Sequence, residues 1–171
     1  MDPVFRNYNM DQAASYAARR PSYSTALYEA IFDYHMQNGG QFGTTLDVGS
    51  GTGIVSRDIA QYFNSTTGAD PGEAMISQAR KLGGRTAAGN AVQYECVSAE
   101  QLSALRTVHP GSVDLLTAAM AVSLSTCFAH TISKEQLVTC LPNHKHAPFG
   151  WSVFFAIIRL RTWVTDKCPY V

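Results

Sequence analysis

The stretch LDVGSGTG, residues 46–53, decides the fold of this chain. It continues a short β-type run at residues 44–48, and a helical pattern begins directly after it. Gly49, Gly51 and Gly53 permit a tight turn and let the backbone approach a ligand closely. A glycine loop between a strand and a helix is the context that a nucleotide-type site requires. We therefore expect a ligand at this loop, and a glycine-rich turn without a ligand is the alternative.

The spacing of the three glycines separates this loop from two other nucleotide-binding loops. It reads G-x-G-x-G, whereas dinucleotide-binding domains carry G-x-G-x-x-G. No G-K-[ST] sequence follows, so the loop is not a phosphate-binding P-loop. The spacing thus disfavours a nicotinamide-dependent enzyme, although this class of enzyme stays open as a less favoured alternative.

Strands and helices alternate outward from the loop. Towards the C-terminus, β-type runs cover residues 66–70, 92–97 and 113–118, and helical patterns cover 54–63 and 71–81. The second of these helices is expected to begin at Pro71, whose fixed φ suits a first turn. Strands that alternate with helices predict an α/β fold with a doubly wound, mostly parallel Rossmann-like sheet and helices on both faces.

Two further helices are expected before the loop. Residues 11–19 form an alanine-rich helical pattern, and alanine is the best helix former. A second helix is expected to run from an N-cap at Ser22 to Gln37. Its apolar positions at helical spacing are Ala26, Leu27, Ala30, Ile31 and Tyr34.

Composition and charge narrow the classes of protein. The chain has 171 residues, enough for one domain, with 13 basic and 13 acidic side chains. A net charge of zero provides no electrostatic footprint for nucleic acid. The sequence has neither an apolar run long enough to span a membrane nor the features of a signal peptide. Four widely separated cysteines argue against a metal site or a disulfide scaffold, so we expect a cytoplasmic protein without metal.

The glycine loop resembles the first motif of class I S-adenosylmethionine-dependent methyltransferases. Three later stretches resemble the second, third and fourth motifs of that family, in the same order: TGADPGEAM at 67–75, VSAE at 97–100 and DLLTAAMA at 114–121. The segment YAARRPSY at 16–23 resembles the helix that covers the cofactor in small-molecule methyltransferases of the trans-aconitate methyltransferase type, common in fungi. The resemblance extends over about residues 5–121.

This resemblance implies a site for S-adenosyl-L-methionine. Asp70 would receive the two ribose hydroxyls, because a carboxylate accepts two hydrogen bonds at once; its alternative role is a helix N-cap. Tyr16 and Arg20 would close over the cofactor, and a solvated arginine beside a core tyrosine is the alternative. The implied cofactor-binding residues are Tyr16, Arg20, Asp47, Gly49, Gly51, Gly53, Asp70, Pro71, Ala99, Glu100 and Ala118. No metal is needed, and no catalytic residue can be assigned.

The resemblance ends near residue 121, where the charge balance also changes. Residues 1–121 carry eight basic and eleven acidic side chains, whereas residues 122–171 carry five and two. We expect a cofactor-binding core over 1–121 and a divergent tail over 122–171, either an added strand or a poorly ordered segment. The sheet would then be incomplete relative to the seven-stranded family fold, with an open edge at the fourth strand. Because Val122-Ser123 can be encoded by GTAAGT, a splice-donor sequence, the tail is interpreted as translated intron or as a genuine divergent C-terminus.

The function that the resemblance implies is methyl transfer from S-adenosyl-L-methionine to a small molecule. A carboxylate or hydroxyl oxygen is the expected acceptor, with a role in secondary metabolism. The alternative is a catalytically weak or inactive remnant that still binds the cofactor. The methyl acceptor and the oligomeric state do not follow from the sequence.

Overall fold

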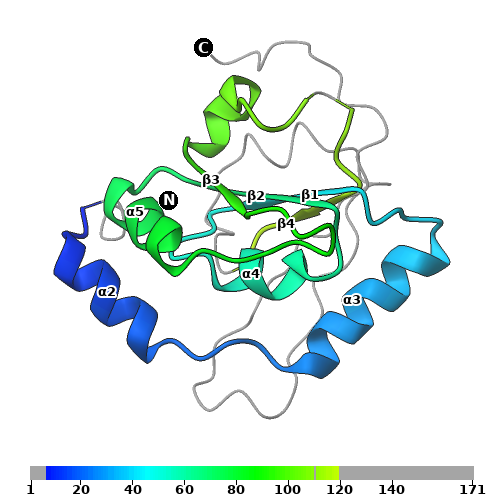
Figure 1. Ribbon diagram of the computed structural model, residues 1–171, viewed down its shortest axis with the longest axis horizontal. Helices are drawn as coiled ribbons and strands as arrows, with labels where there is room; N and C mark the ends of the chain where they lie inside the picture. Colours follow the sequence, from blue (N-terminus) through cyan, green and yellow to red (C-terminus); the bar gives the residue numbers. More distant parts are fainter. Residues whose placement is uncertain (1–6, 110, 120–171) are drawn as a thin grey trace.

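The structure, a computed structural model, describes residues 7–109 and 111–119 (Figure 1). Its helices are α2 (Met10–Arg19), α3 (Thr25–Gln37), α4 (Ile54–Ala60), α5 (Glu73–Leu82) and the 3-10 helix η1 (Ala99–Ala104). Its strands are β1 (Thr44–Val48), β2 (Ser65–Asp70), β3 (Gln93–Cys96) and β4 (Leu115–Thr117). The predictions for residues 122–171 lie outside the described residues.

The strands of the described part form one parallel sheet in the order β3-β2-β1-β4. β1 is central: it pairs with β2 from Thr44↔Ser65 to Val48↔Ala69, and with β4 from Thr45↔Leu115 to Asp47↔Thr117. The chain adds β2 and β3 on one side of β1 and then crosses back to place β4 on the other side. The carboxyl ends of β1 and β4 therefore flank a topological switch point, which is where open α/β sheets bind ligands.

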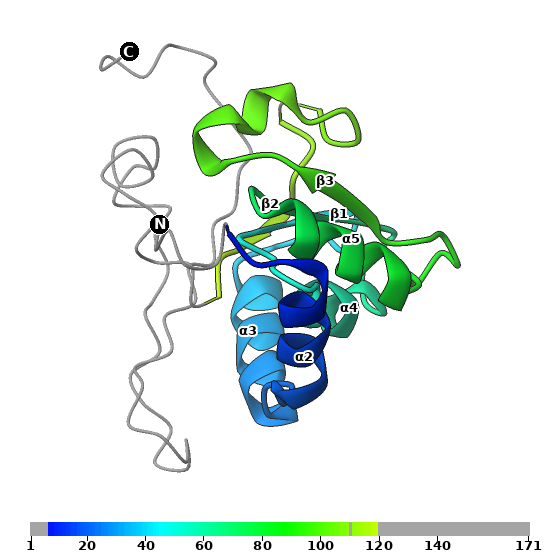
Figure 2. The ribbon, with the colours of Figure 1, turned by 90° about the vertical axis from the view of Figure 1, so that its left-hand side faces the viewer.

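Both faces of this sheet are covered. Figures 1 and 2 show α2, α3 and α4 on one side of the sheet and η1 on the other. Successive residues of a strand point to opposite faces, so Leu115 packs towards α3 and α4, while Leu116 packs towards Leu102 of η1. The predicted doubly wound α/β fold is thereby confirmed.

The start and the buried face of α3 differ from the prediction. Its N-cap is Ser24 rather than Ser22, and the Ser22 hydroxyl instead donates a hydrogen bond to Asp58 of α4. Ala26 and Ala30 are exposed. The buried residues are Tyr28, Ile31, Phe32 and His35. Ile31 belongs to both sets, and Leu27 packs partly buried against the same core, so the prediction is correct in part. Tyr28, Phe32 and His35 complete the buried stripe, because their larger side chains bury more surface than Ala26 and Ala30 would.

Two other helices have shorter limits than the patterns predicted. α5 begins at Glu73 with Gly72 as its N-cap, so Pro71 precedes the helix instead of starting it. α4 ends at Ala60, and Phe63 lies beyond it as a fully buried side chain. These shifts leave the order of strands and helices unchanged.

Two carboxylates hold loops against the sheet: Asp114 binds the loop before β1, and Glu95 binds the loop after η1. At the amino ends of β1 and β4, Oδ2 of Asp114 accepts hydrogen bonds from the amides of Gly43 and Thr44, at 3.1 and 2.9 Å. On the η1 side, Oε1 of Glu95 accepts from the amides of Arg106 and Thr107, at 3.1 and 3.0 Å. The second contact holds the segment after η1 against β3.

Candidate cofactor site

The glycine loop lies over the carboxyl end of β2. The amides of Gly49 and Ser50 both donate to the carbonyl oxygen of Ala69, at 2.8 and 3.1 Å. Gly49, Gly51 and Gly53 have φ angles of 71°, 55° and 77°, in the left-handed region. Side chains other than glycine rarely adopt this region, so the three glycines are required by the path of the backbone.

Gly51 and Gly53 have different surroundings. A Cβ atom at Gly53 would lie 2.6 Å from Oη of Tyr94, so the space beside this residue is already filled by protein. A Cβ atom at Gly51 would have no described atom within 4 Å. The loop therefore packs against Tyr94 at Gly53. At Gly51 it borders open space, where a ligand can approach the backbone.

The carboxylate of Asp70 links this loop to the next turn of the chain. Its Oδ2 accepts a hydrogen bond from the Gly51 amide at 2.9 Å, and its Oδ1 accepts from the Gly72 amide at 2.7 Å. The side chain is 9% exposed. Because Gly72 is the N-cap of α5, the alternative role of Asp70 as a helix N-cap is wrong. The first two sequence motifs thus meet at a single carboxylate.

Asp47 lies in a buried hydrogen-bond network beneath the loop. Its Oδ2 accepts from the Ser56 hydroxyl of α4 at 2.6 Å, and its Oδ1 accepts from the Thr117 hydroxyl of β4 at 2.9 Å. The side chain is 1% exposed, and this burial raises the pKa of Asp47 to about 6, despite both hydrogen bonds. Asp47 thereby connects β1, α4 and β4, and its direct contact with the cofactor stays a prediction.

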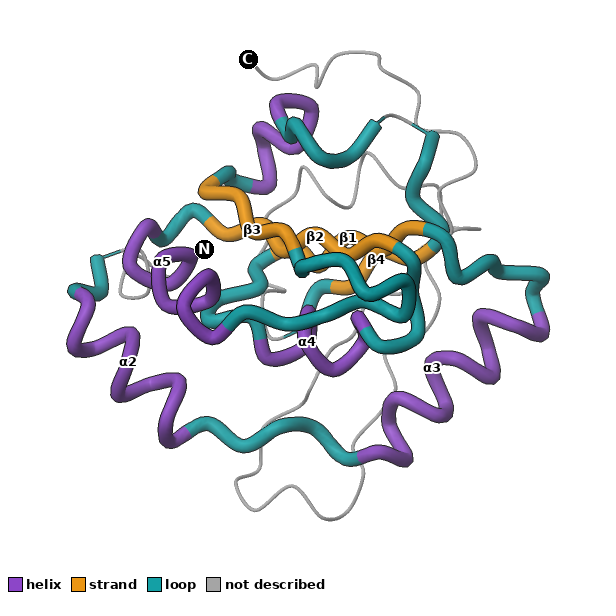
Figure 3. The backbone as a smooth tube through the Cα atoms, in the orientation of Figure 1, coloured by secondary structure: helices purple, strands orange, loops and turns teal. Residues whose placement is uncertain are grey.

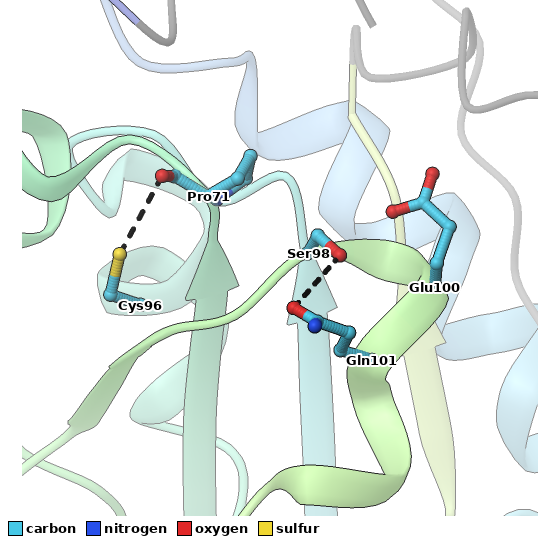
Figure 4. Close-up of a pocket in the computed structure, with 5 residues that line it drawn as sticks. All are labelled: Pro71, Cys96, Ser98, Glu100 and Gln101. Carbon is cyan, nitrogen blue, oxygen red and sulfur yellow. Dashed lines mark hydrogen bonds between the residues drawn. The ribbon is translucent and has the colours of Figure 1, made fainter.

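A pocket lies beside Asp70 at the carboxyl ends of β2 and β3 (Figure 4). Its lining residues are Pro71, Cys96, Ser98, Glu100 and Gln101. The Cys96 thiol donates to the carbonyl oxygen of Pro71 at 3.5 Å, and the Ser98 hydroxyl donates to Oε1 of Gln101 at 3.4 Å. The structure therefore brings together Pro71 and Glu100 from the second and third motifs.

The other residues of the third and fourth motifs flank this region. Ala99 is the first residue of η1, between two residues that line the pocket. Ala118 directly follows β4, is 2% exposed and belongs to the same core cluster as Val48 and Ala69. Its side chain therefore contributes to the core whether or not its backbone contacts a ligand.

Tyr16 and Arg20 contact each other at the end of α2. The Arg20 guanidinium lies 5.5 Å from the ring centroid of Tyr16 and donates a hydrogen bond to Oη of Tyr23 at 3.2 Å. The ring of Tyr8 approaches Tyr16 edge-on, with the centroids 6.2 Å apart. The two predicted covering residues thus belong to one aromatic cluster, and their closure over the cofactor stays a prediction.

Several residues of this region were missed by the sequence reasoning. Tyr94 of β3 is 6% exposed, lies against Gly53 and donates from Oη to the carbonyl oxygen of Gly83 at 3.1 Å. The alternation of residues 92–97 could have marked Tyr94 as inward-facing. Ser56 and Thr117 carry no comparable signal, because their role depends on lying beside Asp47 in space, nine and 70 residues away along the chain.

Residues 7–109 and 111–119 contain neither a metal-binding cluster nor a membrane-spanning helix. Within these residues, no group of three or more His, Cys, Asp or Glu side chains could hold a metal ion. No helix of the same part is long and apolar enough to cross a membrane.

The fold and the loop together define a class of protein. A parallel sheet whose strand order reverses beside a glycine loop, with a carboxylate at the end of the neighbouring strand, is a Rossmann-like nucleotide-type site. A family model described as a methyltransferase domain matches residues 45–143, more than half of the chain. The chain belongs to this methyltransferase family, and its cofactor is S-adenosyl-L-methionine. The match continues past residue 121, where the resemblance in the four motifs ends.

Individual relatives carry methyltransferase names. The chain is 28% identical over 139 residues to methyltransferase cfoB of Aspergillus candidus, a match that covers 77% of this chain and 42% of that protein. It is 32% identical over 111 residues to the probable S-adenosylmethionine-dependent methyltransferase CRG1 of Saccharomyces cerevisiae, covering 65% and 36%. A shorter match, 42% identical over 74 residues, joins it to the ubiquinone biosynthesis O-methyltransferase of Pseudomonas paraeruginosa and covers 43% and 30%. The chain thus spans less than half the length of each of these relatives.

A solved structure supports the fold independently of sequence. Magnesium protoporphyrin IX methyltransferase from Synechocystis, determined with bound S-adenosylmethionine, superposes with a TM-score of 0.53 at 14% identity. The superposition covers 92% of this chain and 96% of that chain. At this level of identity, the likeness concerns the arrangement of the backbone.

The raised pKa of Asp47 leads to a prediction about pH. Folding raises the pKa of Asp47 to about 6, above the value of about 3.9 for an unfolded aspartate. The folded state therefore binds this proton more tightly, so the stability that Asp47 contributes is full below about pH 4 and is lost as the pH rises through about 6. We expect Asp47→Asn to flatten the dependence of the unfolding free energy on pH in this window. Denaturant unfolding at a series of pH values measures this free energy.

Asp33→Asn is the matched control, because Asp33 is exposed. Equal pH dependences of the unfolding free energy for wild type and Asp47→Asn would contradict the prediction.

Proposed function

We propose that this chain binds S-adenosyl-L-methionine through the glycine loop and Asp70 and methylates an oxygen atom of a small molecule. The hydrogen bond between the Gly51 amide and the Asp70 carboxylate carries this proposal, because it sets a charged acceptor beside the open part of the loop. A carboxylate or hydroxyl is the proposed acceptor. The name of the bacterial O-methyltransferase relative supports oxygen as the methylated atom. We further propose the trans-aconitate methyltransferase-like subtype and a role in secondary metabolism.

The described residues fit the cofactor at two points. The open space at Gly51 admits a ligand that any side chain there would obstruct. A carboxylate can accept about four hydrogen bonds, so Asp70 is suited to paired ribose hydroxyls in addition to the two amides. When bound, the cofactor supplies a methyl group on a positively charged sulfur, which is already activated towards nucleophiles.

The remaining contacts follow from the positions of the other motif residues. The pocket residues Pro71 and Glu100, together with Ala99, which precedes Glu100 in η1 and packs against the core, are proposed to hold the adenine end. Ala118 lies at the carboxyl end of β4, on the other side of the topological switch point, and is proposed to border the methionine end. Tyr16 and Arg20 are proposed to cover the cofactor. The protein then acts mainly by holding acceptor and methyl group in line, since proximity supplies about 7–11 kcal/mol in well-oriented reactions.

The alternative is a domain that binds the cofactor without transferring its methyl group. Within the described part of the chain, the proposed contacts account for the cofactor, whereas no side chain is assigned to the methyl acceptor. Such a domain would share every cofactor-binding prediction below and would differ only in turnover.

Replacing the Asp70 carboxylate is expected to weaken cofactor binding. Asp70→Ala should cost about 1.5–3 kcal/mol, the value of a hydrogen bond to a charged group. Asp114→Ala is the matched control, because Asp114 also accepts two backbone amides but lies at the opposite end of the strands. Calorimetry with S-adenosylhomocysteine should show a weaker affinity for Asp70→Ala alone. Equal affinities of the two folded variants would refute the role of Asp70.

A side chain at Gly51 is expected to block the site. Gly51→Val places atoms in the open space of the loop and also forces valine into a left-handed backbone, at a cost of about 1–2 kcal/mol. Gly83→Val separates these effects, since Gly83 has a φ of 68° and no described atom within 4 Å of its Cβ position, but ends α5. Both variants should lose stability in denaturant unfolding, and only Gly51→Val should lose affinity for S-adenosylhomocysteine. Cofactor binding by folded Gly51→Val would contradict the prediction.

Turnover separates the enzyme from the binding domain. We expect the chain to transfer a labelled methyl group from S-adenosyl-L-methionine to one or more members of a panel of small carboxylic acids and phenols. A single-turnover assay with excess protein detects even slow transfer, and the same mixture without protein provides the background. Cofactor binding with no transfer above that background to any acceptor would favour the alternative.

A further inference from the structure

The linker between α2 and α3, residues 20–24, crosses the helix-covered side of the molecule as an extended segment. Figures 1 and 3 show it running from α2, beside α5, to α3 at the other end of the sheet. Its attachment point is Asp58 of α4. The Ser22 hydroxyl donates a hydrogen bond to Oδ2 of Asp58, and Oη of Tyr28 donates to the same oxygen at 2.7 Å.

Ser22 combines exposure with a neighbouring positive charge. The residue is exposed and lies in a part of the linker without regular secondary structure. Arg19 and Arg20 precede it by three and two positions. The Arg20 guanidinium is engaged with Tyr16 and Tyr23, whereas Arg19 is exposed at the last position of α2. An exposed hydroxyl with arginine on its N-terminal side, in an extended segment, suits the charge patterns by which protein kinases select substrates.

We propose that Ser22 is a phosphorylation site for a serine kinase that selects arginine on the N-terminal side, and that its phosphorylation releases the linker from Asp58. In this reaction the Ser22 oxygen forms a bond to the γ-phosphorus of ATP. The bond between that phosphorus and the β–γ bridging oxygen breaks, ADP leaves, and the hydroxyl proton passes to the kinase and then to solvent.

The release follows from the contact that Ser22 makes. Its hydroxyl is a donor to a carboxylate, and a phosphate ester that carries about −1.5 to −2 charges at neutral pH no longer provides that donor. The new anion also repels Asp58. The other bond to Asp58 persists, because Tyr28 is buried, which raises the pKa of its phenol and keeps the donor protonated. Phosphorylation should therefore detach the linker and leave α3 on α4.

Release of the linker is also expected to weaken cofactor binding, an expectation that rests on the proposed function. The linker begins at Arg20, and Tyr16 and Arg20 are the proposed covering residues. Detachment of the linker should then weaken cofactor binding about tenfold, the effect of losing one hydrogen bond of ordinary net strength.

The test uses the full chain and the catalytic subunit of an arginine-directed serine kinase with ATP. Mass spectrometry of the folded protein should place one phosphoryl group on Ser22, and Ser22→Ala should remove it. Arg19→Gln should slow the reaction about tenfold, as expected for one charge-assisted contact. Ser24→Ala is the matched control, because Ser24 is exposed in the same linker and should leave the modification unchanged.

Hydrogen exchange then tests the release. The amides of residues 22–24 should exchange faster in the phosphorylated chain and in Ser22→Asp, while those of residues 28–35 in α3 should not change. Failure to modify Ser22 in the folded chain, or modification with unchanged exchange of residues 22–24, would overturn the proposal. Calorimetry with S-adenosylhomocysteine on both forms distinguishes the two proposals, because absence of binding in either form contradicts the proposed function alone.

Discussion

The hydrogen bond from the Gly51 amide to the Asp70 carboxylate is the contact on which the site depends. It joins a loop that leaves β1 to the turn that leaves β2, and the Gly51 that donates it holds a left-handed backbone. The loop is held from a second direction by the amides of Gly49 and Ser50, which donate to the carbonyl of Ala69. Because these contacts come from the paired ends of β1 and β2, the register of the sheet determines the geometry of the loop.

The two faces of the sheet make different contributions. On the α4 side, Asp47 accepts from Ser56 and Thr117, and the whole network is buried. On the η1 side, Leu46 and Val48 of the same strand belong to an apolar cluster beneath the 3-10 helix. The buried hydrogen bonds of Asp47 tie α4 and β4 to the strand that carries the loop, on a face that also carries an apolar cluster, whereas the apolar cluster on the other face supports η1, whose first residues border the pocket. A substitution in the Asp47 network is therefore expected to affect the glycine loop, and a substitution in the apolar cluster under η1 is expected to affect the pocket.

The N-terminal segment is attached to this core at its ends and in its middle. α2 contacts α5, α3 packs its aromatic stripe over α4, and Ser22 connects the linker between them to Asp58. Asp58 receives donors from the linker and from α3, so one carboxylate on α4 orders a segment far from it in the sequence. Ser22, which is exposed, is the residue through which the linker beside Tyr16 and Arg20 reaches this carboxylate.

Local sequence determined the parts of this protein that depend on local backbone chemistry. LDVGSGTG predicted the loop because only glycine adopts its left-handed conformation readily, and the alternation of β-type runs with helical patterns predicted a mostly parallel sheet. Tertiary structure decided which of two helical stripes of α3 is buried, which serine caps that helix, and which hydroxyls reach Asp47. Ile31 belongs both to the predicted stripe and to the buried one, which adds Tyr28, Phe32 and His35, so the helical pattern alone could not choose the buried side. The choice depends on the surface that α4 and the sheet present, and the partners of Asp47 depend on strand register, which brings Thr117 beside Asp47. Neither the surface that α3 packs against nor the register of the strands can be read from a short stretch of the sequence.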